Sequence, residues 1–199
     1  MFRKTSALVA TLGLCLAATQ AAHATETYTI DNVHSGVTFK IRHLVAKTAG
    51  RFDTFSGTIV VDREDMTKST VELTIDPASI DTDSEKRDTH LKSADFFDVE
   101  KFPSITFKSS KIAKTAENQY AVTGDFTMHG VTKTITIPVE VLGFGPSPWG
   151  KGGMAGFEAN FTVNRQDYGI NWNKVLDAGG VMLGDDVEVS ITIEAGMKE

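Results

Sequence analysis

The chain has 199 residues, 41% of them hydrophobic, and a formal net charge of −6 at neutral pH. This length suits one domain with a sizeable core, and the negative charge argues against nucleic-acid binding and against electrostatic docking on anionic lipid headgroups. The sequence contains no internal repeat or low-complexity tract that would divide it, so we expect a single domain.

The N-terminal segment has the pattern of a secretory signal peptide. Arg3 and Lys4 precede an uncharged run over residues 7–18, and Ala22 and Ala24 occupy the two small-residue positions of a cleavage site. The run is well short of the ~20 apolar residues that span a bilayer, which argues against a retained membrane anchor.

The single cysteine does not indicate a lipoprotein, because Cys15 follows Leu14 where the lipid-modifying machinery needs a small residue. We expect residues 1–24 to be removed and residues 25–199, beginning at Thr25, to form one domain with no stable membrane anchor. That domain has no cysteine, so its fold must depend on packing and strand pairing instead of disulfides.

Apolar and polar residues alternate through most of the exported chain. Val37, Phe39 and Ile41, for example, alternate with Thr38 and Lys40, which is the period of two expected for a strand with one dry face. This pattern predicts about eight antiparallel strands. The other segments that show it are residues 55–61, 71–75, 105–108, 120–128, 135–141, 157–163 and 187–194.

Turn-forming residues separate several of these segments. The pairs Asn118-Gln119 and His129-Gly130 each predict a turn between consecutive strands, and His129 is expected to serve that turn. Pro138 lies inside a strand pattern, and it predicts an edge, a bulge or a strand end at its position.

Eight strands with one apolar face each can stack as two sheets or close into a barrel, and closure removes edges that promote aggregation. Residues 104–116 and 131–144 are long strands for a sandwich, which favours an all-β, eight-stranded antiparallel barrel whose interior is either ligand-binding or self-filled. The apolar residues that we predict to line this lumen are Val37, Phe39, Ile41, Val71, Leu73, Ile75, Ile105, Phe107, Tyr120, Val122, Phe126, Met128, Ile135, Ile137, Val139, Phe157, Phe161, Val163, Val187, Val189 and Ile191.

One segment departs from the strand pattern. Residues 84–97, SEKRDTHLKSADFF, predict a short helix, because Ser84 can cap its start and Glu85 lies in the first turn, where the helix dipole favours an anion. Arg87 and Leu91 share one face of that helix. The helix could therefore plug one barrel opening with its apolar side chains buried.

Together with RHL at residues 42–44, MHG at residues 128–130 and RQDYG at residues 165–169, this helix resembles the YceI family of lipocalin-like barrels. The resemblance extends from about Tyr28 to the last strand. It implies a periplasmic protein that binds, sequesters or transports a long-chain amphiphilic lipid, such as a polyisoprenoid or an isoprenoid quinone-like molecule, in a long apolar lumen. Fatty acids or fatty amides bound in a stress response are alternative ligands, and a homodimer is compatible with the resemblance.

Polar residues at strand ends and on the helix are candidates for contacts with a lipid headgroup. His43 either bonds to a backbone carbonyl near the rim or contacts the ligand. Arg165 either pairs with Asp167 at a strand end or supplies an anion contact. The full candidate set is His43, Arg87, His90, Arg165 and Asp167.

Signals of catalysis are weak. The exported chain has no cysteine nucleophile, and the sequence has no G-x-S-x-G, H-E-x-x-H or Gly-rich phosphate motif. Asp88 and His90 diverge on a helix, so we expect no metal site and no cofactor other than a bound lipid. An enzyme acting on that lipid would have to use His43, His90 or Asp167, whereas a self-filled barrel would be a non-binding interaction protein.

Overall fold

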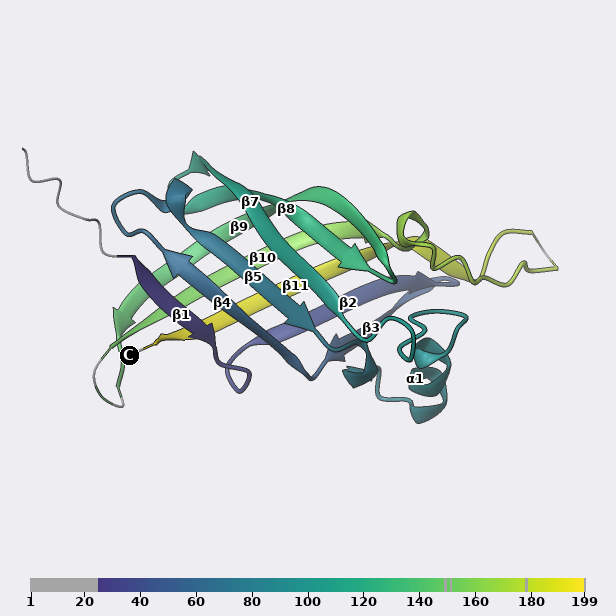
Figure 1. Ribbon diagram of the computed structural model, residues 1–199. Helices are drawn as coiled ribbons and strands as arrows, with labels where there is room; N and C mark the ends of the chain where they lie inside the picture. The colour runs from purple at the N-terminus through teal and green to yellow at the C-terminus, as the bar shows by residue number, and fades with distance from the viewer. Residues whose placement is uncertain (1–24, 149, 151, 178, 199) are drawn as a thin grey trace, which may run out of the picture.

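The computed structural model describes residues 25–148, 150, 152–177 and 179–198, so the predicted signal peptide lies outside the described residues. Within these residues the strands form an elongated barrel with one α-helix near one end (Figure 1). The helical elements are α1 (Glu85–Lys92) and the 3-10 turns η1 (Met66–Lys68), η2 (Pro77–Ser79) and η3 (Arg165–Tyr168). The strands are β1 (Glu26–Ile30), β2 (Gly36–His43), β3 (Ala46–Phe52), β4 (Phe55–Val61), β5 (Thr70–Ile75), β6 (Ile80–Asp81), β7 (Ile105–Ala116), β8 (Gln119–Met128), β9 (Val131–Pro146), β10 (Gly153–Asn164) and β11 (Leu183–Met197).

The barrel closes between its first and last strands. β1 pairs with β4 on one side and with β11 on the other, which gives the ring order β1-β4-β5-β7-β8-β9-β10-β11. Eight antiparallel strands complete the ring, and the predicted eight-stranded barrel is confirmed. Backbone pairing of β1 with β11 joins the first and last strands of the ring, so neither of them is an open sheet edge.

At three places in the ring, two short strands lie end to end where a single strand would otherwise run. β1 and β2 both pair with the same edge of β11: Ile30 of β1 lies opposite Ala195, and Gly36 of β2 lies opposite Thr192. In the same way β3 leads into β4, and β6 follows β5 and pairs with β3. The segments β2, β3 and β6 therefore extend the barrel wall toward α1 (Figure 1).

The sequence pattern did not identify every strand. The eight predicted segments included β2, whereas β1 closes the ring, and β3 was not predicted. β1 is only five residues long. β3, with the sequence AKTAGRF, has too few large apolar residues to display a period of two.

The turns lie close to their predicted positions. His129 and Gly130 both have positive φ, 51° and 74°, which matches the two-residue hairpins whose twist fits antiparallel strands. The β7–β8 hairpin turns at residues 117–118, one position earlier than predicted. Asn118 takes the positive φ of 55° there, because asparagine tolerates the left-handed conformation better than most residues.

Helix α1 is shorter than predicted. It ends at Lys92 and does not continue to residue 97, because Ser93 is extended and its hydroxyl donates to the His90 carbonyl oxygen at 2.7 Å. Ser84 occupies the N-cap as predicted, although its side chain makes no capping hydrogen bond. After the helix the chain returns to the barrel and buries Phe96.

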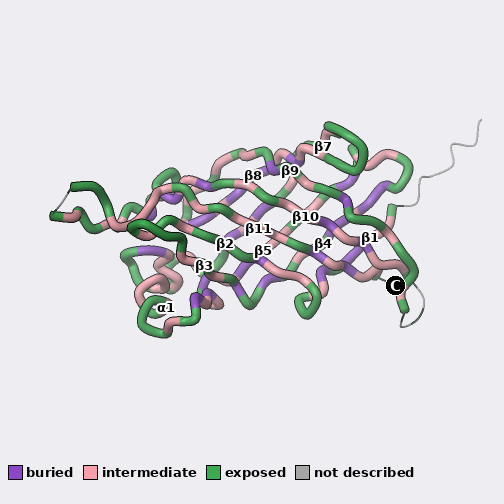
Figure 2. The backbone as a smooth tube through the Cα atoms, turned by 180° about the vertical axis from the view of Figure 1, so that it is seen from behind, coloured by how far each residue is buried: buried purple, intermediate pink, exposed green. Residues whose placement is uncertain are grey.

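The two ends of the barrel are built differently. Tyr28, Val61 and Ala195 are fully buried where β1, β4 and β11 meet, and the C-terminus lies at this end, which we call the β1 end (Figure 1). Along the strands, buried positions are interspersed with exposed ones (Figure 2). The opposite end, which we call the α1 end, carries longer exposed loops (Figure 2). Among the described residues, no helix is both long and apolar enough to cross a lipid bilayer.

Candidate functional site

The barrel encloses a cavity of about 630 Å³. Its wall is apolar along most of its length, because the inward-facing positions of the strands are occupied by aliphatic and aromatic side chains. Of the residues predicted to line the lumen, every one except Ile135 lies in the cavity wall. Their contact with a ligand stays a prediction.

Ile135 packs against the hydrophobic core but lies outside the cavity wall. The pairing of β9 with β10 ends at Val139, next to Pro138, whose missing N–H predicts such an end. In this part of β9 the η3 turn takes the place of β10, with Lys133 Nζ 3.0 Å from Asp167 Oδ1. Ile135 belongs to this section of the strand, which explains why its inward parity does not bring it to the cavity.

Several wall residues were not predicted from the sequence. Ile59 and Ile193 lie inside the predicted strands at residues 55–61 and 187–194, and their alternation could have identified them as wall residues. Met66, Trp172 and Met182 come from η1 and from loops, which carry no strand period. The other unpredicted apolar wall residues are Ile30, Phe52, Ile80, Leu91, Phe96, Phe97, Ile112, Val141, Ala159, Ile170 and Leu183.

Polar wall residues concentrate at the α1 end. Two of them, Lys86 and Arg87, are basic and exposed to solvent. The cavity is therefore an apolar tube with cationic and hydrogen-bonding groups near one end, which suits an apolar chain with a polar or anionic end group. The polar residues in this part of the wall are His43, Thr48, Thr82, Ser84, Lys86, Arg87, His90 and the buried Arg165.

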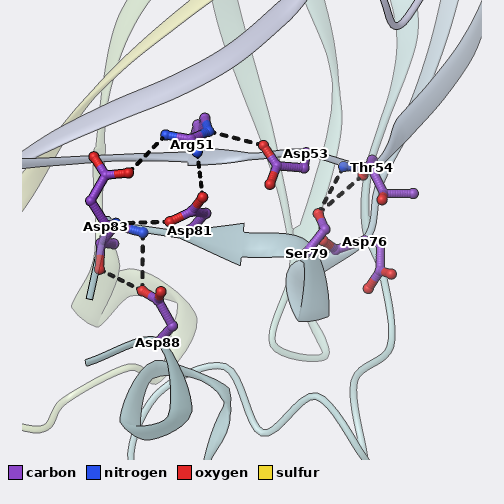
Figure 3. A network of polar contacts seen from close by, with 9 residues as sticks. Arg51, Asp53, Thr54, Asp76, Ser79, Asp81, Asp83 and Asp88 are labelled. Carbon is purple, nitrogen blue, oxygen red and sulfur yellow. Dashed lines mark hydrogen bonds and ion pairs between the residues drawn. The ribbon is translucent and has the colours of Figure 1, made fainter. Parts of the chain in front are cut away.

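An ion-pair network fixes the wall beside α1 (Figure 3). Arg51 of β3 contacts Asp81 of β6, Asp53 (Nε–Oδ1 3.0 Å) and Asp83 (Nη1–Oδ1 3.4 Å). The carboxylates, Asp81 before the others, raise the pKa of the Arg51 guanidinium above its ordinary value. The network ties the two-residue strand β6 to β3, where little backbone pairing is available to do so.

Helix α1 is held on this wall through one buried residue, Thr82. The Asp88 carboxylate accepts hydrogen bonds from the Thr82 backbone N–H, at 3.0 Å, and from its hydroxyl. Arg87 donates from Nε to Thr82 Oγ1 at 2.7 Å and from Nη2 to the Thr82 carbonyl oxygen at 2.6 Å. Arg87 thus lies in the cavity wall in a fixed position, and its Nη1 group forms no hydrogen bond with a described residue.

An aromatic cluster spans the α1 end. The His90 ring lies edge-on to Phe96 and to Trp172, with ring centroids 5.0 Å apart in both pairs. His90 Nε2 lies 2.8 Å from the Asp95 carboxylate. These contacts connect α1 to the segment after η3 through side chains and not through a β-ladder.

Arg165 is a structural cation at the same end, with only 3% of its surface exposed. Nε donates to the Gly184 carbonyl oxygen at 2.9 Å, and Nη1 donates to the carbonyl oxygens of Ile170 and Trp172 at 2.7 and 2.8 Å. Nη2 donates to the Asp185 carboxylate at 3.2 Å. Burial lowers the pKa of Arg165 from its ordinary value, and Asp185 partly offsets this effect. Arg165 therefore joins η3 and the segment that follows it to β11.

The predicted pairing of Arg165 with Asp167 is wrong. Asp167 lies outside the cavity wall and pairs with Lys133 of β9. The actual carboxylate partner of Arg165 is Asp185, which belongs to β11 and is distant in the sequence. A pattern of neighbouring residues carries no information on such a contact.

Two histidines also differ in their surroundings. His43 lies half-buried in the cavity wall, and its imidazole makes no hydrogen bond with any described residue, so the first of its two predicted roles, a bond to a backbone carbonyl, is not observed. His129 Nδ1 lies 3.0 Å from the Tyr168 carbonyl oxygen, and its ring packs against Phe102 at 4.5 Å. His129 therefore serves its turn, as predicted, and also holds η3 against the β8–β9 hairpin.

One group of metal-ligating side chains converges among the described residues. Ligand atoms of Asp31, His34 and Glu194 lie within 4.8 Å of one another at the interruption between β1 and β2, outside the cavity. His34 Nδ1 is 2.8 Å from Asp31 Oδ2. His34 lowers the pKa of Asp31, and Asp31 raises the pKa of His34, so each favours the charged form of the other.

Both the sequence and the fold of this chain are similar to those of known proteins. Residues 28–195 match the model of the YceI-like domain. A UPF0312 protein of Staphylococcus aureus strain N315 is 40% identical over 173 residues, which cover 86% of this chain and 98% of the relative. BcnA of Burkholderia cenocepacia superposes with a TM-score of 0.72 at 26% identity, covering 83% of this chain and 98% of its own.

Two further solved structures have the same fold. The YCEI protein of Campylobacter jejuni has a TM-score of 0.69 at 30% identity and covers 80% of this chain and 91% of its own. A polyisoprenoid binding domain from Saccharophagus degradans has a TM-score of 0.63 at 15% identity and covers 86% and 98%. The chain belongs to the family of YceI-like domains, as the sequence motifs suggested.

Proposed function

We propose that this protein is a periplasmic carrier that binds one long-chain amphiphilic lipid inside the barrel. The observation that carries the proposal is the continuous apolar wall of a cavity of about 630 Å³, a size typical of ligand pockets. Burial of each methylene group contributes ~0.8 kcal/mol, so a chain of about twenty carbons would gain roughly 16 kcal/mol before ordering costs are subtracted.

The position of the charged wall residues sets the orientation of this ligand. Lys86 and Arg87 lie at the α1 end, where an anionic or strongly polar headgroup would find both cations and the His90 ring. Arg165 is a poorer headgroup contact, because its guanidinium is already bonded to three carbonyl oxygens and to Asp185. The apolar chain of the lipid would then extend toward the β1 end.

The apolar wall and the fold of a related structure support a long-chain isoprenoid as the bound lipid. The related structure from Saccharophagus degradans is described as a polyisoprenoid binding domain, which supports a polyisoprenoid or a quinone-like isoprenoid over an unbranched fatty acid. The signal-peptide pattern of residues 1–24 supports export to the periplasm. We propose binding and transfer of the lipid and not its chemical conversion, because the described residues of the cavity wall include no paired nucleophile and base.

Extraction of the purified protein with organic solvent, followed by mass spectrometry, tests the proposal. We expect one long-chain lipid in a near-stoichiometric amount from the wild type. Ile137→Arg, which places a charge in the cavity wall, should yield none. A folded wild-type protein that releases no lipid and takes up none from vesicles would refute the carrier function and indicate a self-filled barrel.

The orientation is tested on α1 itself. Arg87→Gln together with Lys86→Gln should weaken binding of an anionic lipid by roughly tenfold or more, while binding of its neutral analogue changes little. Lys92→Gln is the matched control, because Lys92 lies on the same helix but outside the cavity wall. Equal losses for charged and neutral lipids would show that the head lies elsewhere.

A further inference from the structure

Two segments that are far apart in the sequence bring three metal-ligating side chains together. Asp31 and His34 lie in the turn between β1 and β2, and Glu194 lies on β11. Their ligand atoms lie within 4.8 Å of one another, and none of the three residues belongs to the cavity wall. We call these three residues the β1–β2 cluster. The cluster is separate from the proposed lipid site.

Backbone hydrogen bonds hold the turn of the β1–β2 cluster against β11. The Asp31 N–H donates to the Glu194 carbonyl oxygen at 2.9 Å. The Glu194 N–H donates to Ser35 Oγ at 3.0 Å, and the Ser35 hydroxyl donates to the Glu194 carbonyl oxygen at 3.1 Å. The backbone therefore keeps the three ligand residues in place, in addition to the contacts between their side chains.

The ligand atoms of the cluster face a common point. Asp31 Oδ1 accepts a hydrogen bond from the Val33 N–H at 2.8 Å, whereas Oδ2 faces His34. His34 Nδ1 lies 2.8 Å from Asp31 Oδ2 and 3.9 Å from Glu194 Oε1. Two ligand atoms of a tetrahedral zinc ion lie ~3.3 Å apart, because each is ~2 Å from the metal. The two observed distances lie on either side of this value, so small side-chain rotations would accommodate an ion.

The charge of the cluster favours a cation. Within the described part of the chain, His34 is the only ion-pair partner of Asp31 and of Glu194. At neutral pH two carboxylates and one imidazole carry a net negative charge, whether or not the imidazole is protonated. A divalent ion bound in place of the proton between His34 Nδ1 and Asp31 Oδ2 would balance the charge of both carboxylates.

The ligand atoms also select the kind of ion. One imidazole nitrogen with two carboxylate oxygens suits a divalent transition metal such as Zn²⁺, whereas Ca²⁺ and Mg²⁺ prefer oxygen ligands alone. His34 is exposed, and Asp31 and Glu194 are half-buried, so solvent can reach the cluster. Water can therefore fill the fourth position, as it does in zinc sites with three protein ligands.

We propose that Asp31, His34 and Glu194 bind one divalent transition-metal ion, such as Zn²⁺, outside the cavity. The ion would join the turn between β1 and β2 to β11 through side chains, at the point where pairing along β11 changes from β1 to β2. It would stabilise the barrel wall without contacting the lipid. This inference does not depend on the proposed carrier function.

Calorimetric titration with zinc chloride tests the site, on purified protein that carries no histidine tag and has been freed of metal with a chelator. We expect the wild type to bind one equivalent and its melting temperature to rise, whereas calcium chloride should do neither. Glu194→Gln and His34→Gln each remove a direct ligand. Each should lower the zinc affinity by roughly tenfold or more, since even the loss of an outer hydrogen bond to a ligand has an effect of this size.

Asp95→Asn is the matched control. Asp95 lies 2.8 Å from His90 Nε2, the same separation as between Asp31 and His34, but no third metal-ligating side chain converges on this pair among the described residues. We expect Asp95→Asn to bind zinc as the wild type does. Loss of zinc binding in this variant would place the ion at His90 and overturn the proposal.

Glu194→Gln separates a metal site from a simple ion pair, because it leaves Asp31 and His34 in place. Cooperative melting in the presence of the chelator checks that each variant is folded. A folded Glu194→Gln variant whose melting temperature no longer responds to zinc supports the site. A wild type that binds no zinc, or a folded Glu194→Gln variant that binds it as tightly as the wild type, would show that the cluster is an ion pair only and overturn the proposal.

Discussion

The β1 end and the α1 end of one barrel are closed by different interactions. At the β1 end, β1 pairs with both β4 and β11, and Tyr28 is buried with its hydroxyl donating to Glu26 at 2.7 Å. Burial, and then Glu26, raise the pKa of Tyr28 to about 12. Arg63 covers this end, 4.0 Å above the Phe144 ring. Backbone ladders and buried side chains together make it continuous.

At the α1 end, side-chain contacts replace the ladder. Thr82 holds α1, the His90–Trp172 contact spans the end, and Arg165 ties η3 to β11. Each of these contacts can break without unpairing a strand, whereas opening the β1 end would break two β-ladders. We therefore expect the barrel to open at the α1 end at a smaller free-energy cost than at the β1 end, and the predictions below test that difference.

We expect the largest loss of stability from a charge placed in the cavity wall between the two ends. Ile137→Arg should lower the free energy of unfolding by about 5 kcal/mol, because it leaves an unpaired charge in an apolar cavity. Thr136→Arg, one residue away on the exposed face of β9, should have little effect. Denaturant unfolding measures both variants. Similar losses would mean that the parity of β9, and with it the cavity wall, is misassigned.

The sequence predicts those residues of the cavity wall that belong to regular strands, because their alternation is visible over a few neighbouring residues. A period of two is local, so it places Val37, Phe107 and Val189 in the wall correctly. It could not place Trp172 or Met182, which reach the cavity from irregular segments.

The contacts of the α1 end were harder to predict, because their partners are far apart in sequence. Arg165 forms an ion pair with Asp185 of β11, whereas Asp167, which is nearer in sequence, pairs with Lys133.

The second prediction concerns the strongest contact of the α1 end. Arg165→Ala should cost about 3 kcal/mol of stability, because three carbonyl oxygens and the Asp185 carboxylate lose their donor. Asp167→Ala should cost well under 1 kcal/mol, because its ion pair with Lys133 is exposed. Thermal and denaturant unfolding compare the two. A similar cost for both would contradict the structural role of Arg165.

The third prediction compares the two ends directly. Trp172→Ala removes the contact with His90 and Phe96, and it should speed transfer of bound lipid to acceptor vesicles several-fold while lowering stability by about 3 kcal/mol. Tyr28→Phe loses one hydrogen bond at the β1 end and should cost about 1 kcal/mol without changing the transfer rate. Equal acceleration by both variants would remove the distinction between the ends.

The smallest expected effect is at the interruption between β1 and β2, where His34 pairs with Asp31. Asp31 raises the pKa of His34 above its ordinary 6.5, so the stabilisation is present below that pH and is lost as the pH rises through the raised pKa. His34 lowers the pKa of Asp31 below its ordinary 3.8, so the stabilisation is also lost as the pH falls through that lowered value. His34→Gln should therefore lower the melting temperature slightly between these two limits and not at alkaline pH. Asp31→Asn should show the same pH window, and a difference that persisted at pH ~9 in either variant would exclude the ion pair as its cause.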